Sequence, residues 1–316
     1  MHRIDGAGAT VDNKFTDGDP VGGVQATVVT AAWLNDFQEN IMAVLAAAGV
    51  SPTKGRAADL LDAIRTYSGG GIVGGARNAK MSIAAASATA TFTADELIVE
   101  TALAGKTYRL SNVNKTINLA TTGVGGMDVG TAPVSGAVGV YVIYNPDLPL
   151  SSTNPALIAQ NASSARVPEV HGAVNMPAGY TASALVAVLQ TNASSQFPIL
   201  FMEDRHVTIV PTQILNTTTA AASFTSLTMA SVPYNAISVD ITWQMTSGGS
   251  STLNFATAAS AASLNAIGPN MSLTSAALTG SGGYATQPLV TPKTTYYTFA
   301  AAGGATLAVY NIGYRF

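Results

Sequence analysis

The chain has 316 residues, enough for two or three domains, yet only 10% of them are charged, against roughly 25% in an ordinary soluble domain. Its net charge of -3 disfavours a nucleic-acid partner, which needs a basic surface. No apolar run approaches the length of a membrane-spanning helix, and the opening segment lacks the apolar run of a secretory signal. The absence of cysteine excludes disulfide scaffolds and thiolate zinc sites.

The charged residues are unevenly distributed along the chain. Residues 1–68 contain 13 of them and residues 69–206 contain 15, whereas residues 207–316 contain three. A long segment with so few charges must be solvated by Ser, Thr and Asn or covered by another chain. We therefore expect four parts: an N-terminal region 1–68, a glycine-rich linker 69–76, a central β domain 77–206 and a C-terminal β-sandwich 207–316.

Residues 1–68 open with a polar arm and continue into a predicted helix. From Trp33 to Leu45, apolar residues recur every three or four positions, which is the period of an amphipathic helix. Thr30 is suited to be its N-cap, and Gly49 is suited to end it.

A second helix is predicted to start at Ser51-Pro52, because proline suits the first helical position. Leu60, Leu61, Ile64 and Tyr67 line one of its faces. Two short helices cannot bury their apolar faces alone, so we expect this region to dock on copies of itself or on a partner. The expected docking residues are Trp33, Phe37, Ile41, Leu60 and Ile64.

Short strand patterns fill the rest of the chain. Those in the central domain are Leu97–Val99, Tyr108–Leu110, Val138–Tyr144, Leu185–Leu189 and Ile199–Met202, with a helical turn near Ala156–Ala162. In the C-terminal domain, Ile237–Met245 alternates apolar and polar residues without a fault, and 295–300 and 306–316 are predicted to form a hairpin around Gly303-Gly304. The predicted fold class is mainly β, with a short N-terminal α-helical region and antiparallel β-sandwich-type domains.

No group of residues in the sequence forms a convincing catalytic motif. Gly105-Lys106-Thr107 lacks the upstream glycine of a phosphate-binding loop. The set Glu203-Asp204-Arg205-His206 is interpreted as a solvated turn in which Arg205 pairs with a carboxylate. The chain has three histidines, and histidines that meet around the symmetry axis of an oligomer would offer a metal site. Residues 207–316 contain one acid, Asp240, so a glycosidase there would lack its second carboxylate. We predict no enzyme activity, no cofactor and no metal.

Aromatic residues gather in the C-terminal domain. Trp243 lies on the apolar face of its strand, which favours core packing. Carbohydrate-binding surfaces combine aromatic faces with neutral hydrogen-bonding groups, and this part of the chain is rich in both. The candidate contact residues are Tyr284, Tyr296 and Tyr297.

Two thirds of the sequence resemble a known family. MHRIDGAGATVDNKFTDGDPVGGVQATVVTAAWLNDFQENIMAVLAAAGV and SPTKGRAADLLDAI resemble the N-terminal attachment region of tail fibre proteins of tailed bacteriophages. ARNAKMSIAAASATATFTADELIVET, YRLSNVNKTINLATTGVGGMDVGTAP, VYVIYNPD and NMPAGYTASALV are similar to a module of the same proteins. The resemblance covers residues 1–206, and residues 207–316 lie where such proteins often carry variable receptor-binding tips.

The resemblance implies a virion component made in the host cytoplasm: a homotrimeric tail fibre attached to the tail or baseplate by residues 1–68. Its C-terminal domain would contact a host-surface glycan or pilus through Tyr284, Tyr296 and Tyr297. Partners would be other copies of the chain and phage tail proteins, with no nucleic acid and no membrane insertion. Low charge near a three-fold axis also avoids repulsion between identical side chains.

Two alternatives remain open at this point. A baseplate or collar subunit would share the docking helices but bind only phage proteins. A polysaccharide-degrading tailspike is disfavoured, because no long run of regular repeats is apparent and residues 207–316 are poor in acids.

Overall fold

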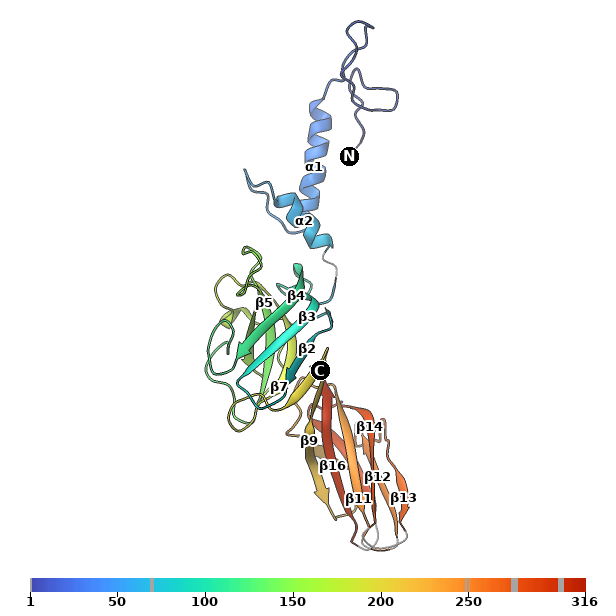
Figure 1. Cartoon of the computed structure of the whole chain (residues 1–316). Coiled ribbons are helices and arrows are strands. Elements are labelled where there is room, and N and C mark those ends of the chain that lie inside the picture. Colours follow the sequence, from blue (N-terminus) through green and yellow to red (C-terminus); the bar gives the residue numbers. More distant parts are fainter. Residues whose placement is uncertain (1, 69–70, 248, 250, 274–277, 301–303) are drawn as a thin grey trace. The chain divides into compact units, whose positions relative to one another are not determined.

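The computed structural model describes residues 2–68, 71–247, 249, 251–273, 278–300 and 304–316. The chain divides into two compact units, Met1–Gly70 and Gly71–Phe316 (Figure 1). The first unit contains helices α1 (Ala31–Ala47) and α2 (Asp59–Ser68). None of the described helices is both long and apolar enough to cross a lipid bilayer.

Local chemistry sets both ends of α1. The hydroxyl of Thr30 accepts a hydrogen bond from the Trp33 backbone N–H at 3.3 Å, as an N-cap does. At the other end, Gly49 has a φ of 64°, and the Val50 N–H donates to the Leu45 carbonyl at 2.9 Å. This is the Schellman arrangement, which needs a left-handed residue after the helix. Both boundaries predicted from the sequence are confirmed.

Removing the N-cap of α1 is expected to destabilise the helix without disturbing its neighbours. Thr30→Ala leaves the Trp33 N–H without its acceptor, at a cost of about 1 kcal/mol. Hydrogen exchange of the α1 amides measures this as roughly a fivefold loss of protection. Thr30→Ser is the matched control, since it keeps the hydroxyl. Equal protection in the alanine and serine variants would contradict the assigned cap.

Helix α2 begins at Asp59, so the predicted start at Ser51-Pro52 is wrong. The intervening Gly55 has a φ of 85°, which no helix interior accommodates. The carboxylate of Asp59 accepts a hydrogen bond from the Thr53 N–H at 2.7 Å and pairs with Arg56 at 2.7 Å. These bonds fold residues 53–56 into a turn and lower the pKa of Asp59, first through the bond from Thr53 and then through the one from Arg56.

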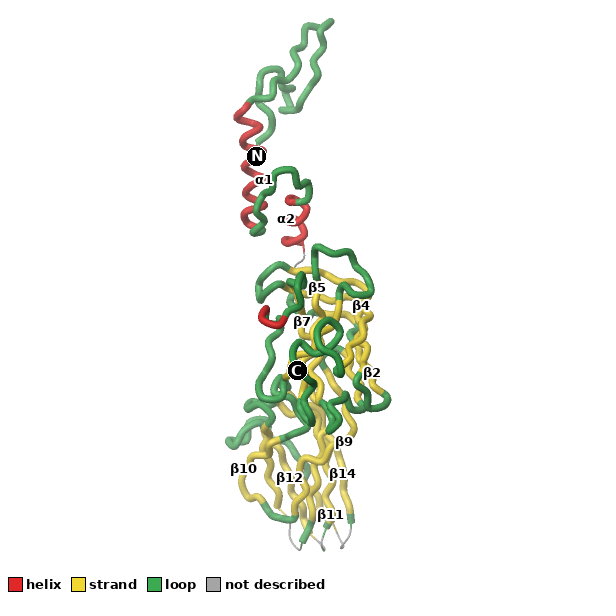
Figure 2. The backbone as a smooth tube through the Cα atoms, turned by 90° about the vertical axis from the view of Figure 1, so that its left-hand side faces the viewer, coloured by secondary structure: helices red, strands yellow, loops and turns green. Residues whose placement is uncertain are grey.

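The second unit contains all the described strands, arranged in two antiparallel sheets (Figures 1 and 2). The strands are β1 (Ala76–Arg77), β2 (Lys80–Ile83), β3 (Thr89–Glu100), β4 (Thr107–Asn118), β5 (Ala137–Tyr144), β6 (Ala156–Asn161), β7 (Ala182–Gln190), β8 (Leu200–Glu203), β9 (His206–Thr217), β10 (Ala221–Thr228), β11 (Ser238–Thr246), β12 (Ser251–Ala258), β13 (Asn270–Leu273), β14 (Thr279–Pro288), β15 (Thr294–Ala300) and β16 (Thr306–Arg315). The larger sheet has the order β14-β11-β16-β9-β8-β2-β3-β7-β5-β6, with β1 and β4 also paired to β3, and the smaller one has the order β10-β15-β12-β13.

The larger sheet continues across the expected boundary between residues 206 and 207. Strands β8 and β9 form a hairpin there, with Asp204 at a φ of 51° in its turn. One buried hydrophobic cluster extends from Val73 to Phe316. Part of the expected linker also belongs to this unit, because the Ile98 N–H donates to the Gly75 carbonyl at 2.9 Å. Gly69 and Gly70 lie outside the described residues.

The strands predicted in the central domain are confirmed, but the helical turn near Ala156–Ala162 is wrong. Those residues form β6, paired antiparallel to β5. Its residues Ala156–Ala159 are buried on both faces of the sheet. A short apolar run of this kind lacks a period that would separate a buried strand from a buried helix.

The C-terminal part is a β-sandwich, as predicted. The alternating strand β11 directs Ile241, Trp243 and Met245 into the space between its sheet and the smaller sheet. There Trp243 packs against Phe255 of β12, with ring centroids 6.3 Å apart. The predicted core position of Trp243, which is 6% exposed, is therefore confirmed.

The predicted hairpin between residues 295–300 and 306–316 is wrong. Strand β15 pairs with β10 and β12, whereas β16 pairs with β9 and β11 in the other sheet. The chain crosses between the layers here, since Phe299 and Leu307 are both buried in the core from opposite sheets. Residues 301–303 of the expected turn lie outside the described residues.

Candidate functional site

The helical unit exposes more large hydrophobic side chains than it buries among the residues described. Its core consists of Leu45, Ala48, Val50 and Ala63, with Ile41 packed against it. The exposed hydrophobic side chains of its two helices are Leu34, Phe37, Val44, Leu60, Leu61 and Ile64, with exposed fractions from 37% to 51%. Exposed apolar side chains in this number are more typical of interaction surfaces than of the surface of a monomer.

An aromatic stack joins the N-terminal arm to the start of α1. The rings of Trp33 and Phe37 are stacked, with centroids 5.9 Å apart, and the edge of Phe15 meets Trp33 at 5.2 Å. The Trp33 indole N–H donates to the His2 carbonyl at 3.2 Å. The backbone N–H of His2 in turn donates to the Asp36 carboxylate at 3.1 Å and is the first cause of its lowered pKa.

Of the five expected docking residues, three are exposed and two are partly covered. Phe37, Leu60 and Ile64 are 41%, 39% and 51% exposed. Trp33 is half-buried beside Phe15, and Ile41 is half-buried against the helical core. Phe15 was not predicted as part of this surface, because an isolated aromatic residue in a polar arm has no periodic neighbours.

The apolar residues along α1 follow a heptad pattern. Leu34, Phe37, Ile41 and Val44 are spaced three, four and three residues apart, and we call this stripe the α1 seam. Such spacing is typical of a and d positions in coiled coils. Among its flanks, Gln38 and Asn40 carry no charge, so identical helices would meet along the seam without repulsion.

The structure separates the expected contact tyrosines. Tyr296 and Tyr297 are neighbours on β15, so they point to opposite faces of its sheet. Tyr297 packs against the hydrophobic core, while Tyr296 lies on the outer face and is half-exposed. The side chain of Tyr284 lies outside the described part of the chain.

Tyr296 lies on a neutral, polar surface of the smaller sheet. Register places it opposite Ser226 of β10 on one side and opposite the buried Ala258 of β12 on the other. We call this surface the tip face, and its residues are Ser226, Thr228, Thr252, Asn254, Tyr296 and Thr298. One aromatic ring among hydroxyl and amide groups, without a charge, is the surface chemistry that suits sugars.

The histidines of the second unit form separate acid pairs. His171 Nε2 lies 3.4 Å from Asp128 Oδ2, and both side chains are buried, at 1% and 2% exposed. His206 Nε2 lies 2.6 Å from Asp240 Oδ2. Within the described residues, no group of three or more His, Cys, Asp or Glu side chains is placed to hold a metal ion.

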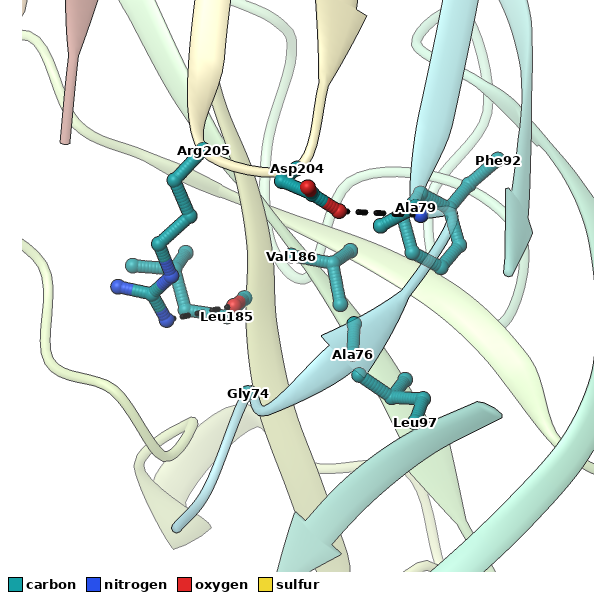
Figure 3. A pocket seen from close by; sticks show the side chains of 9 residues that line it. All are labelled: Gly74, Ala76, Ala79, Phe92, Leu97, Leu185, Val186, Asp204 and Arg205. Atoms are coloured by element: carbon teal, nitrogen blue, oxygen red, sulfur yellow. Dashed lines mark hydrogen bonds between the residues drawn. The ribbon is translucent and has the colours of Figure 1, made fainter. Parts of the chain in front are cut away.

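The predicted pairing of Arg205 is confirmed. Its guanidinium donates to both carboxylate oxygens of Glu169, at 3.0 and 2.5 Å. Figure 3 shows Arg205 and Asp204 among the residues that line a small cavity. The cavity lies between β1, β3 and β7 and has a volume of about 90 Å³. Asp204 accepts from the Ala79 N–H and Arg205 donates to the Leu185 carbonyl, both at 3.3 Å. The cavity volume is well below the roughly 300–1,000 Å³ typical of pockets for drug-sized ligands.

No protein-family model matches the chain, and no curated protein matches it in sequence. Three solved structures each share 10% sequence identity with it. A chain of the T13 IBDV viral particle has a TM-score of 0.22, with 75% of this chain and 69% of that chain covered. The Bacillus thuringiensis Cry1Da tryptic core variant and the delta-endotoxin Cry8Ea1 have TM-scores of 0.18 and 0.21, with 77% and 76% of this chain covered. The chain spans about half the length of these two, at 53% and 51%. None of the three bears on its function.

Proposed function

We propose that the chain is a structural protein of a phage virion, a homotrimeric tail fibre. Residues 1–68 dock on the tail or baseplate, and the C-terminal β-sandwich contacts the host cell surface. The observation that carries this proposal is the helical unit, which leaves Phe37, Leu60 and Ile64 exposed and has a core of only a few small and medium side chains. A surface of this kind is stabilised by burial against other chains.

The α1 seam supports association of the chain with copies of itself. A helix with apolar a and d positions buries that stripe by winding around copies of itself. The remaining exposed side chains on α2, Leu60, Leu61 and Ile64, are then left for the tail or baseplate. Sedimentation equilibrium of the purified chain tests the oligomer, with an expected mass three times the 32.0 kDa of one copy. A monomer in dilute buffer would overturn the trimer.

The location of the chain tests the fibre itself. A density map of the intact particle is expected to place residues 1–68 within the tail or baseplate and residues 207–316 at its outside. A C-terminal domain covered by other phage proteins would instead identify a baseplate or collar subunit.

The tip face is expected to take part in adsorption through Tyr296. Tyr296→Ala removes the one aromatic side chain of this face, and we expect about tenfold weaker binding of the purified protein to cells of the phage's host. Repetition of the site in the oligomer enlarges the effect on whole particles. Binding of fluorescently labelled protein to cells measures it.

Tyr297→Phe is the matched control for this experiment. It alters the neighbouring tyrosine, whose side chain faces the core, and so should leave binding unchanged. If Tyr296→Ala binds cells as the unaltered protein does, the tip face does not contact the receptor.

A further inference from the structure

A second cavity lies where the two halves of the β unit meet. It has a volume of about 220 Å³, and its walls come from residues 133–137 and 161–163 and from Gln190, Ala230, Pro233, Tyr234 and Lys293. This volume is below the roughly 300–1,000 Å³ typical of pockets for drug-sized ligands. The cavity therefore fits one small polar molecule.

Hydrogen bonds hold the walls of this cavity in place. The buried Asn235 accepts from the Val167 N–H at 2.9 Å and donates to the Val167 carbonyl at 2.8 Å, which fixes the turn before Asn235 against the segment between β6 and β7. Ser163 Oγ accepts from the Ala137 N–H at 3.0 Å on the opposite wall. A site whose walls are already held requires little ordering when a ligand binds.

Lys293 is the one charged residue among the described residues that line the cavity. Its ammonium lies 5.0 Å from the ring centroid of Tyr234, in a cation–π contact. Among the described residues, no carboxylate lies within ion-pair distance of Lys293. The backbone also fixes this residue, since the Met229 N–H donates to the Lys293 carbonyl at 2.8 Å. The cavity is thus a positive site without a resident counter-charge.

The remaining lining combines hydrogen-bonding groups with apolar surface. Asn161 and Gln190 offer amide groups, while Pro133 and Pro233 offer apolar patches. A sugar ring presents both kinds of surface, and an acid group on the sugar would satisfy the free charge of Lys293. We propose that this cavity binds a single carboxylate-bearing sugar residue of a host-surface polysaccharide. This inference rests on the proposed host contact and assigns it a second site, apart from the tip face.

Binding of free sugars to the full-length protein tests the inference without phage or cells. Isothermal titration with glucuronate is expected to give a Kd on the order of 1 mM, given the small size of the ligand. Glucose, the neutral counterpart, should bind about tenfold more weakly, as should glucuronate to Lys293→Met, since each change removes the ion pair. Lys80→Met is the matched control, because Lys80 pairs with Glu203 on a strand outside the cavity.

Several results would overturn the inference. These are the absence of glucuronate binding, equal binding by the Lys293→Met variant, or equal affinity for acetate, which would indicate a general anion site. A crystal soaked with glucuronate checks the location independently of any variant, and density away from Lys293 and Tyr234 would contradict it. If the protein binds cells through Tyr296 but binds no glucuronate, the proposed function stands and this site fails. If the protein binds glucuronate but does not bind cells, this site stands and the proposed host contact fails.

Discussion

A chain carrying Phe37→Asp and Val44→Asp is expected to remain a monomer and to be absent from assembled particles. Each substitution places a carboxylate in the α1 seam, where association would bury it beside its copies from the other chains. Buried, unpaired carboxylates cost several kcal/mol each. We therefore expect association to weaken at least about 100-fold, which corresponds to ~2.7 kcal/mol. Sedimentation velocity over a concentration series measures the change.

The matched control is Asn35→Asp with Ala43→Asp. It adds the same two charges to α1 at exposed positions outside the seam, and it should leave the oligomer intact. Leu60→Asp with Ile64→Asp on α2 is expected to form oligomers that fail to join the particle. A Phe37→Asp, Val44→Asp protein that still sediments as the unaltered protein does would contradict the seam as the contact between copies.

Tyr314→Ala is expected to lower the unfolding free energy of the β unit by about 3–5 kcal/mol, the cost of removing a large buried ring. Tyr314 of β16 is fully buried, and its hydroxyl donates to the Val188 carbonyl of β7 at 2.8 Å. The side chain therefore ties the C-terminal strand to the central strands. Tyr314→Phe keeps the ring and loses only this bond, at about 1 kcal/mol. Urea denaturation followed by tryptophan fluorescence measures both, and equal loss in the two variants would contradict the packing role of the ring.

The same residue makes stability sensitive to alkaline pH. Burial raises the pKa of the Tyr314 hydroxyl above its usual 10.0, and it raises that of Tyr141 too, with a further contribution from Glu169. The folded state keeps both protons at a pH where the unfolded chain loses them. The stabilisation is thus complete below pH 10, and it falls as the pH rises further, by about 1.4 kcal/mol per pH unit for each group.

Tyr314→Phe should show a shallower alkaline slope, because one of the phenols whose pKa is raised by burial is gone. Denaturation midpoints between pH 8 and pH 11 in steps of about half a unit reveal it. Identical slopes in the unaltered and Tyr314→Phe proteins would show that the proton on Tyr314 is not linked to folding.

Features that depend on near neighbours in the chain could be predicted from the sequence. The hydroxyl of Thr30 and the left-handed Gly49 act within one helical turn, so their residue types are sufficient to place the ends of α1. The faultless alternation of Ile237–Met245 likewise reports which side of the strand is buried. The exposure of Phe37 was also predicted, because two short helices cannot bury all of their apolar residues against each other.

Features that depend on distant parts of the chain could not be predicted. The strand identity of β6 comes from its pairing with β5, and the separation of β15 from β16 comes from the layer each one joins. The cavity at Lys293 needs walls from segments more than a hundred residues apart. A local pattern of residues does not indicate which distant segment a strand or a cavity wall will contact.

The continuity of the larger sheet from the central strands into the sandwich has a mechanical consequence. Strand β9 follows β8 in a hairpin and is hydrogen-bonded along its length to β16. Strand β16 runs back toward the central strands, and just beyond its end the Phe316 N–H donates to the Arg205 carbonyl. Antiparallel hydrogen bonds lie perpendicular to their strands. A pull along β9 therefore loads many of these hydrogen bonds at once in shear, so that they resist the force together and not one after another.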